Sequence, residues 1–96
     1  MGQGFYRVVE SPRFLERLEA AEPSFVAILL EYVYPILSAE PTESAGHFPV
    51  VYERPFFSIE LRSKGGWWGV VIYEVLQDEL LVMLHDYLWE RIDQPE

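Results

Sequence analysis

The chain has 96 residues, half of them hydrophobic and 16% of them aromatic, which is typical of one small globular domain and argues against disorder. It contains no cysteine, so disulfides, thiolate chemistry and cysteine-ligated zinc are excluded. Seven basic against sixteen acidic residues give a formal net charge of −9. That charge repels nucleic acid at long range and favours partners with basic surfaces, or else serves only to keep the domain soluble.

The sequence does not point to a membrane, a cofactor or a metal. No apolar run approaches the roughly 20 residues of a membrane span, and the start of the chain, Met1–Gly4, does not resemble a signal peptide. The two histidines, His47 and His85, lie far apart without an ordered carboxylate pattern, which makes a poor metal site. We therefore expect residues 1–96 to form a single cytoplasmic domain without a cofactor, a metal or membrane contact.

The first half of the chain predicts a strand followed by two helices. Residues 5–10 alternate as a strand does, and Ser11-Pro12 is typical of a helix start, with serine at the N-cap and proline at the first helical position. After an interruption at 22–24, apolar residues recur at helical spacing over 25–37. Pro35 lies inside this pattern and lacks an amide, so it predicts a kink or an early end near Tyr34.

The second half predicts an antiparallel meander. Residues 57–62 alternate in polarity, 67–76 have the pattern of a covered central strand, and 80–84 form a third strand. Between the first two strands, Gly65-Gly66 supplies the positive-φ positions of a tight hairpin. We expect Ala39–Pro55 to be a loop that includes a short extended piece at Val50–Tyr52. The chain after residue 84 is expected to be a short helical turn or a frayed end.

Taken in chain order, these elements predict an α+β fold. It consists of an N-terminal strand, a helical hairpin and a three-stranded antiparallel meander, and the helices pack on one face of the sheet.

Arg62 is the first candidate for chemistry. By alternation it projects to the sheet face opposite Ile59 and Leu61, where a guanidinium suits phosphate binding. The alternative is an ion pair with Glu60 or Glu74.

His85 is the second candidate, because Asp86 and Tyr87 follow it directly. These three residues offer a general acid or base and a hydroxyl for stacking or proton transfer. The alternative is a structural histidine that caps the end of a strand.

Three tryptophans are candidates for an interface. Trp67 and Trp68 are neighbours in one strand, so one of them points away from the helices. An exposed tryptophan on an open sheet face is an interface residue or a base-stacking platform. Trp89 is the third candidate for this role. The alternative is that this aromatic load belongs to the core.

Three runs of the sequence resemble a known family. They read E-L-R-S-K-G-G-W at Glu60–Trp67, V-I-Y at Val71–Tyr73 and L-H-D-Y at Leu84–Tyr87. In this order they resemble the C-terminal half of HigB-like, phage-derived toxins of the RelE/ParE superfamily. The opening at Tyr6–Pro12 is similar as well, and the predicted order of elements is the one that this resemblance implies.

The resemblance implies the toxin of a type II toxin–antitoxin module, which cleaves mRNA on the ribosome and is held by an antitoxin. In such toxins basic side chains hold the scissile phosphate while a His, Tyr or Lys assists attack by the 2′-hydroxyl. Arg62 matches the arginine of E-L-R, His85 the histidine of L-H, and Tyr87 the aromatic residue after it. Lys64 joins Arg62 as a candidate contact to RNA.

The basic positions of the toxin motif are largely replaced in this chain. Gly69 and Val70 stand where the central strand carries an arginine, and Trp89 and Glu90 stand in place of a lysine pair. Each replacement removes positive charge that would neutralise phosphate. Three hypotheses therefore stay open: a toxin that cleaves mRNA, a catalytically silent domain of this fold that binds a basic protein partner, and an unrelated small α+β domain.

Overall fold

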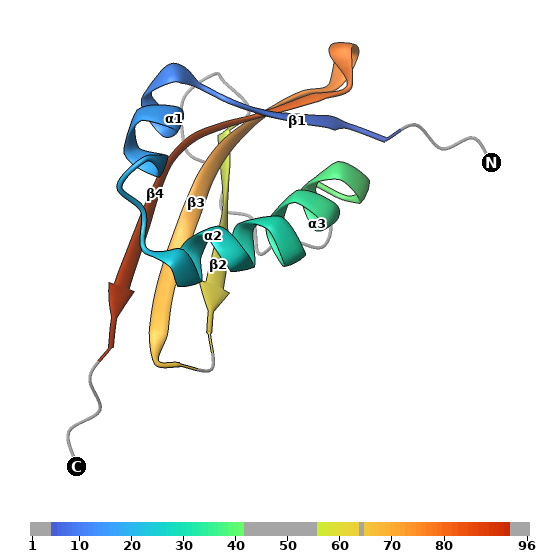
Figure 1. Ribbon diagram of the computed structural model, residues 1–96. Coiled ribbons are helices and arrows are strands. Elements are labelled where there is room, and N and C mark those ends of the chain that lie inside the picture. The colour runs from blue at the N-terminus through green and yellow to red at the C-terminus, as the bar shows by residue number, and fades with distance from the viewer. Residues whose placement is uncertain (1–4, 42–55, 64, 93–96) are drawn as a thin grey trace.

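The fold is a four-stranded sheet with helices on one of its faces (Figure 1). The computed structural model describes residues 5–41, 56–63 and 65–92. The strands are β1 (Arg7–Glu10), β2 (Phe56–Arg62), β3 (Trp67–Leu76) and β4 (Leu81–Arg91). The helices are α1 (Pro12–Leu18), α2 (Pro23–Ile28) and α3 (Tyr34–Ala39). A π turn, η1 (Leu29–Val33), separates the last two helices, and a 3-10 turn, η2 (Gln77–Glu79), separates β3 from β4.

The sheet has the order β1-β4-β3-β2, with β1 parallel to β4 and the other neighbours antiparallel. The predicted α+β class and the antiparallel meander are confirmed, and the parallel pairing of β1 is a feature that the sequence did not predict. The loop piece expected at Val50–Tyr52 lies outside the described residues. None of the described helices is long and apolar enough to cross a membrane.

The helical hairpin begins where the sequence predicts. The hydroxyl of Ser11 accepts a hydrogen bond from the amide of Phe14 at 3.2 Å, and proline follows Ser11 at the first helical position. The second helix is irregular near Pro35 as expected, but the irregularity is a π turn, in which the amide of Tyr34 donates to the carbonyl of Leu29. Because Pro35 has no amide, the helix loses one regular bond there, and the π turn adds one residue just before it.

The hairpin between β2 and β3 needs one glycine rather than two in an unusual conformation. Gly66 has φ of 89°, and it is the only described glycine with a positive φ. The amide of Ser63 donates to the carbonyl of Trp67 at 2.9 Å and closes the hairpin. The prediction of a tight turn is therefore confirmed, and among the described residues of the turn only Gly66 is left-handed.

The last strand is longer than predicted. The sequence indicated a strand over residues 80–84, then a helical turn or a frayed end, but β4 runs for 11 residues to Arg91. Its second half pairs with the start of β3, with Trp89 opposite Gly69. The register shifts between Ile72 and Tyr73 of β3, where His85 is the extra residue of a β-bulge in β4. The bulge breaks the alternation at His85, which is why the sequence pattern seemed to end there.

The two faces of the sheet differ in what covers them. Val71, Tyr73 and Val75 of β3 are buried in one cluster with Phe14 and Phe25 of the helices, on what we call the helix face. Successive residues of a strand alternate between faces, so the remaining side chains of β3 lie on the opposite side, the outer face. These are Trp68, Val70, Ile72, Glu74 and Leu76.

Candidate functional site

Arg62 lies on the outer face, as alternation predicted, but it is paired. Its Nη2 is 3.4 Å from Oε2 of Glu60, two residues earlier in β2, and the Arg62 side chain is 75% exposed. The same oxygen accepts a hydrogen bond from the indole Nε1 of Trp68 at 2.6 Å. That indole hydrogen bond, and secondarily the charge of Arg62, lower the pKa of Glu60, so its carboxylate is ionised at neutral pH. The ion-pair alternative is thus the arrangement that the structure contains.

His85 also lies on the outer face, where a buried carboxylate holds it. Its Nε2 is 3.0 Å from Oε1 of Glu74, which is only 4% exposed, and the His85 side chain is 31% exposed. The ring of Phe56 lies 5.0 Å from the imidazole. Glu74 is therefore a partner of His85, a role that the sequence did not indicate because the two residues stand on different strands. A half-exposed imidazole held by a carboxylate can take up or deliver a proton.

Tyr87 lies on the opposite side of the sheet from His85. Its ring stacks on Phe25 at 4.1 Å and meets Phe14 edge-on at 5.5 Å. Its hydroxyl donates to the carbonyl of Arg17 at 3.2 Å, and the guanidinium of Arg17 lies 4.4 Å from the ring centre. The phenol is thus part of the packing between α1 and β4 on the helix face.

The three residues predicted as catalytic are not brought together. Arg62 pairs with Trp68 in the register of β3, whereas His85 contacts Glu74, six positions further along that strand. At about 3.3 Å per residue this separation is about 20 Å, too far for both side chains to contact one phosphate. Tyr87 lies on the other face. Lys64, the remaining candidate contact to RNA, lies outside the described residues.

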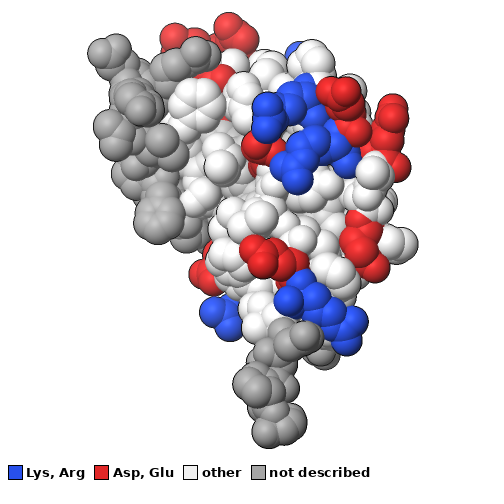
Figure 2. All heavy atoms as spheres, turned by 90° about the vertical axis from the view of Figure 1, so that its left-hand side faces the viewer, with Lys and Arg blue, Asp and Glu red and all other residues white. Residues whose placement is uncertain are grey.

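A second group of charges joins α1 to β4. Nε of Arg13 is 3.3 Å from Oδ2 of Asp86, and Nη1 of Arg17 donates to Oδ1 of the same carboxylate. Partial burial alone would raise the pKa of Asp86, but the amide of Tyr87 and the two guanidiniums outweigh it and lower that pKa. On the face shown in Figure 2, basic groups lie beside acidic ones rather than forming a continuous basic surface.

The three tryptophans divide between the faces. Trp67 and Trp89 stack with their planes at 4° and their ring centres 5.8 Å apart, and Nε1 of Trp89 donates to Oγ of Ser24 at 3.0 Å. Trp89 also packs 5.5 Å from Phe25, so this pair extends the aromatic packing of the helix face. Trp68 is the tryptophan that points away from the helices, and its indole is bound to Glu60. Among the described residues, no group of three acidic or histidine side chains could hold a metal ion.

Comparisons with known proteins agree on the fold. No protein-family model and no curated protein matches the chain. Among solved structures, the RelBE2 toxin–antitoxin complex from Mycobacterium tuberculosis is similar with a TM-score of 0.70 and 19% identity, covering 93% of this chain and 95% of that one. The isolated E. coli RelE toxin has a TM-score of 0.65 and 15% identity, covering 95% and 88% of the two chains. The intact E. coli RelBE complex has a TM-score of 0.66 and 17% identity, covering 94% and 99%. At these identities the likeness is one of architecture, and the chain has the fold of the RelE toxins.

Proposed function

We propose that this protein is the toxin component of a toxin–antitoxin pair and that it acts by binding protein rather than by cutting RNA. The antitoxin as partner is supported by the fold, since two of the similar structures are complexes of a toxin with its antitoxin. The observation that carries the mode of action is the separation of Arg62, His85 and Tyr87, which occupy two faces and opposite ends of the sheet. The HigB-like subtype and the cytoplasmic location remain predictions from the sequence.

The charges support the same proposal. Cleavage of RNA needs cations that stabilise the charge of the transition state and offset the repulsion of the backbone. Here Arg62 is paired with Glu60, and Arg13 and Arg17 share Asp86, in a chain of net charge −9. Such a surface suits a target protein with lysines and arginines on its contact face.

Ribosome-dependent mRNA cleavage is the second candidate, because one observation favours it. The pair of His85 and Glu74 is a buried carboxylate holding a half-exposed imidazole, as a general acid or base requires. In this alternative His85 would move the proton, and Arg62 with Lys64 would contact the RNA.

Induced expression in a bacterial host separates the two candidates. We expect growth arrest that is equally strong for wild type, Arg62→Ala and His85→Ala, without cleaved mRNA when the purified protein is added to translating ribosomes. Coexpression of the protein encoded beside this gene should relieve the arrest and yield a complex that copurifies. Relief by His85→Ala together with cleaved mRNA would establish the ribonuclease instead. If expression has no effect on growth or translation, the protein is not a toxin.

A further inference from the structure

Strand β2 presents hydrogen-bond donors at an edge of the sheet. It is the last strand in the order β1-β4-β3-β2. The amide of Ser63 points to β3, where it donates to Trp67, and amides of an antiparallel strand alternate in direction. The amides of Ser58, Glu60 and Arg62 therefore point away from β3. No described residue accepts a hydrogen bond from them. Ser58 is buried, but Glu60 and Arg62 are exposed, so the edge can pair with another strand at these two positions.

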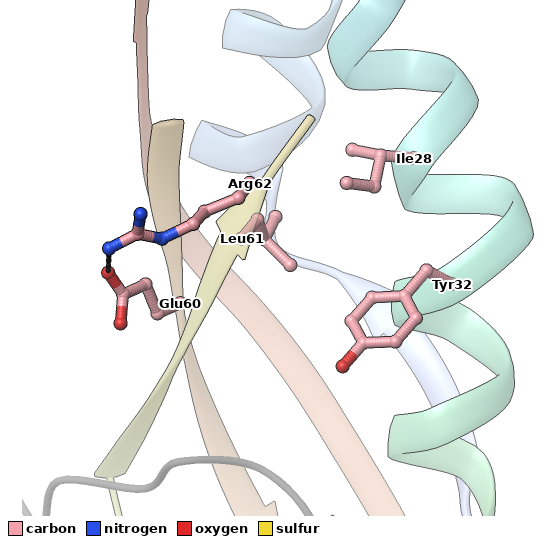
Figure 3. A pocket seen from close by; sticks show the side chains of 5 residues that line it. All are labelled: Ile28, Tyr32, Glu60, Leu61 and Arg62. Atoms are coloured by element: carbon pink, nitrogen blue, oxygen red, sulfur yellow. Dashed lines mark hydrogen bonds and ion pairs between the residues drawn. The ribbon is translucent and has the colours of Figure 1, made fainter. Parts of the chain in front are cut away.

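A hollow of about 410 Å³ lies beside the same edge, between β2 and the helices. Ile28 and Tyr32 line it from the helical side, and Leu61 points toward them from β2, as Figure 3 shows. Arg62 and Glu60 lie on the other side of the strand and form the polar rim. The hollow thus offers apolar walls on the helix face and charges on the outer face.

Tyr32 belongs to the π turn that precedes Pro35. Its side chain is one of the exposed large hydrophobic groups, at 45% exposure, although it faces a hollow that could cover it. Single π turns inside helices are frequent at functional sites. The irregular helix, the exposed tyrosine and the open strand edge therefore coincide at one place in the fold.

We propose that this edge binds an extended segment of a partner protein, which pairs with β2 as a fifth strand. Side chains of such a segment alternate between faces, so every second one would enter the hollow and should be large and apolar. Those between them would lie beside Glu60 on the outer face and should include lysine or arginine, since opposite charges favour cross-strand pairs. This inference rests on the proposed function, because it names the surface that a protein partner would use.

A second copy of the chain is a poorer occupant than a basic segment. Two copies would each bring a net charge of −9 to the contact and repel one another.

The test is a selection of short random peptides displayed on phage, made on the wild-type protein. We expect the selected peptides to alternate large apolar with polar or basic residues. Glu60→Pro removes an outward amide and leaves the bonds to β3 intact, so it should weaken peptide binding about tenfold or more. Glu60→Ala, the matched control, loses the same side chain but keeps the amide and should bind within about threefold of wild type. Tyr32→Ala, which removes one wall of the hollow, should also weaken binding.

One further measurement keeps the test decisive. If Glu60→Pro does not fold, amide exchange by NMR on the wild type replaces it, and peptide binding should slow the exchange of the Glu60 and Arg62 amides. The proposal is wrong if no alternating peptide is enriched, or if the selected peptides bind Glu60→Pro as well as Glu60→Ala. Because the selection uses no cellular target, it can succeed while the growth assay fails, and the reverse also holds.

Discussion

At Gly69 the neighbouring strand and an aromatic ring leave no room for a side chain. A Cβ at this position would lie 2.0 Å from the carbonyl oxygen of Leu88 and 2.7 Å from the ring of Trp89. The toxin motif carries an arginine in this part of the central strand and a lysine at the position of Trp89. Gly69 and Trp89, two departures from that motif, thus belong to one packing arrangement. The ring of Trp89 lies over Gly69, which therefore has to be small.

Gly69→Ala should therefore lower the free energy of unfolding by about 3 kcal/mol, because the clash is with backbone atoms that are fixed by strand pairing. Urea denaturation measures the change. Gly65→Ala is the control, since the nearest atoms to its Cβ would be 3.7 Å away, and it should change stability by about 0.5 kcal/mol or less. Equal effects of the two substitutions would mean that both the backbone at Leu88 and the ring of Trp89 move aside, and that the strand pairing at Gly69 is not fixed.

Asp86 gives the stability of the protein a component that depends on pH. Its folded pKa lies below the ordinary value of 3.8, because the Tyr87 amide and the guanidiniums of Arg17 and Arg13 outweigh the effect of burial. A carboxylate with a depressed folded pKa stabilises fully above its unfolded pKa and loses that contribution as the pH falls through the folded one. Asp86→Asn should thus cost about 1 kcal/mol at neutral pH. The difference from wild type should shrink as the pH falls below 3.8 and vanish once the pH is below the folded pKa of Asp86.

Unfolding in urea from neutral pH to pH 2 would measure this difference. Asp78→Asn is a suitable control, because Asp78 lies in the η2 turn and makes no ion pair with a described residue. A wild-type advantage that persists unchanged in strong acid would show that the Asp86 charge is not its source.

At the scale of elements, the parts that sequence reasoning predicted are those with local signals. Ser11-Pro12 starts α1 through contacts within one turn, and Gly66 closes a hairpin between strands that are adjacent in the chain. The pairing of β1 with β4 and the second half of β4 depend on residues far apart in sequence. No local pattern marks such pairings, so these features required the structure.

The candidate site was only partly predictable for a related reason. Arg62 lies on the expected face because β2 alternates without interruption. In a regular strand His85 and Tyr87, two residues apart, would share a face as a joint site requires. The bulge at His85 shifts the alternation by one residue, which turns Tyr87 to the helix face and leaves His85 with Glu74. No local residue pattern around His85 marks such an insertion.

At the scale of the whole molecule, a net charge of −9 on 96 residues implies repulsion within the folded state. Sodium chloride screens this repulsion, so the midpoint of thermal unfolding should rise by a few degrees between low and physiological ionic strength. Glu16 lies in α1 and Glu19 directly follows it, and both are exposed. The double substitution Glu16→Gln and Glu19→Gln should therefore reduce that rise. A midpoint that falls with salt would mean that ion pairs such as Arg13 with Asp86 outweigh the net repulsion.

The parallel pairing of the first strand with the last has a consequence for the order of assembly. The sheet neighbour of β1 is β4, so Arg7 finds its partner Leu81 only after more than 70 further residues have been synthesised. The helices are also made before β2, β3 and β4, whose buried side chains cover most of their apolar sides. Contacts between residues so distant in sequence slow folding, while the β2–β3–β4 meander can form locally. A chain whose residues 81–91 are still inside the ribosome cannot close this sheet, so β1 stays without its sheet neighbour until β4 has emerged.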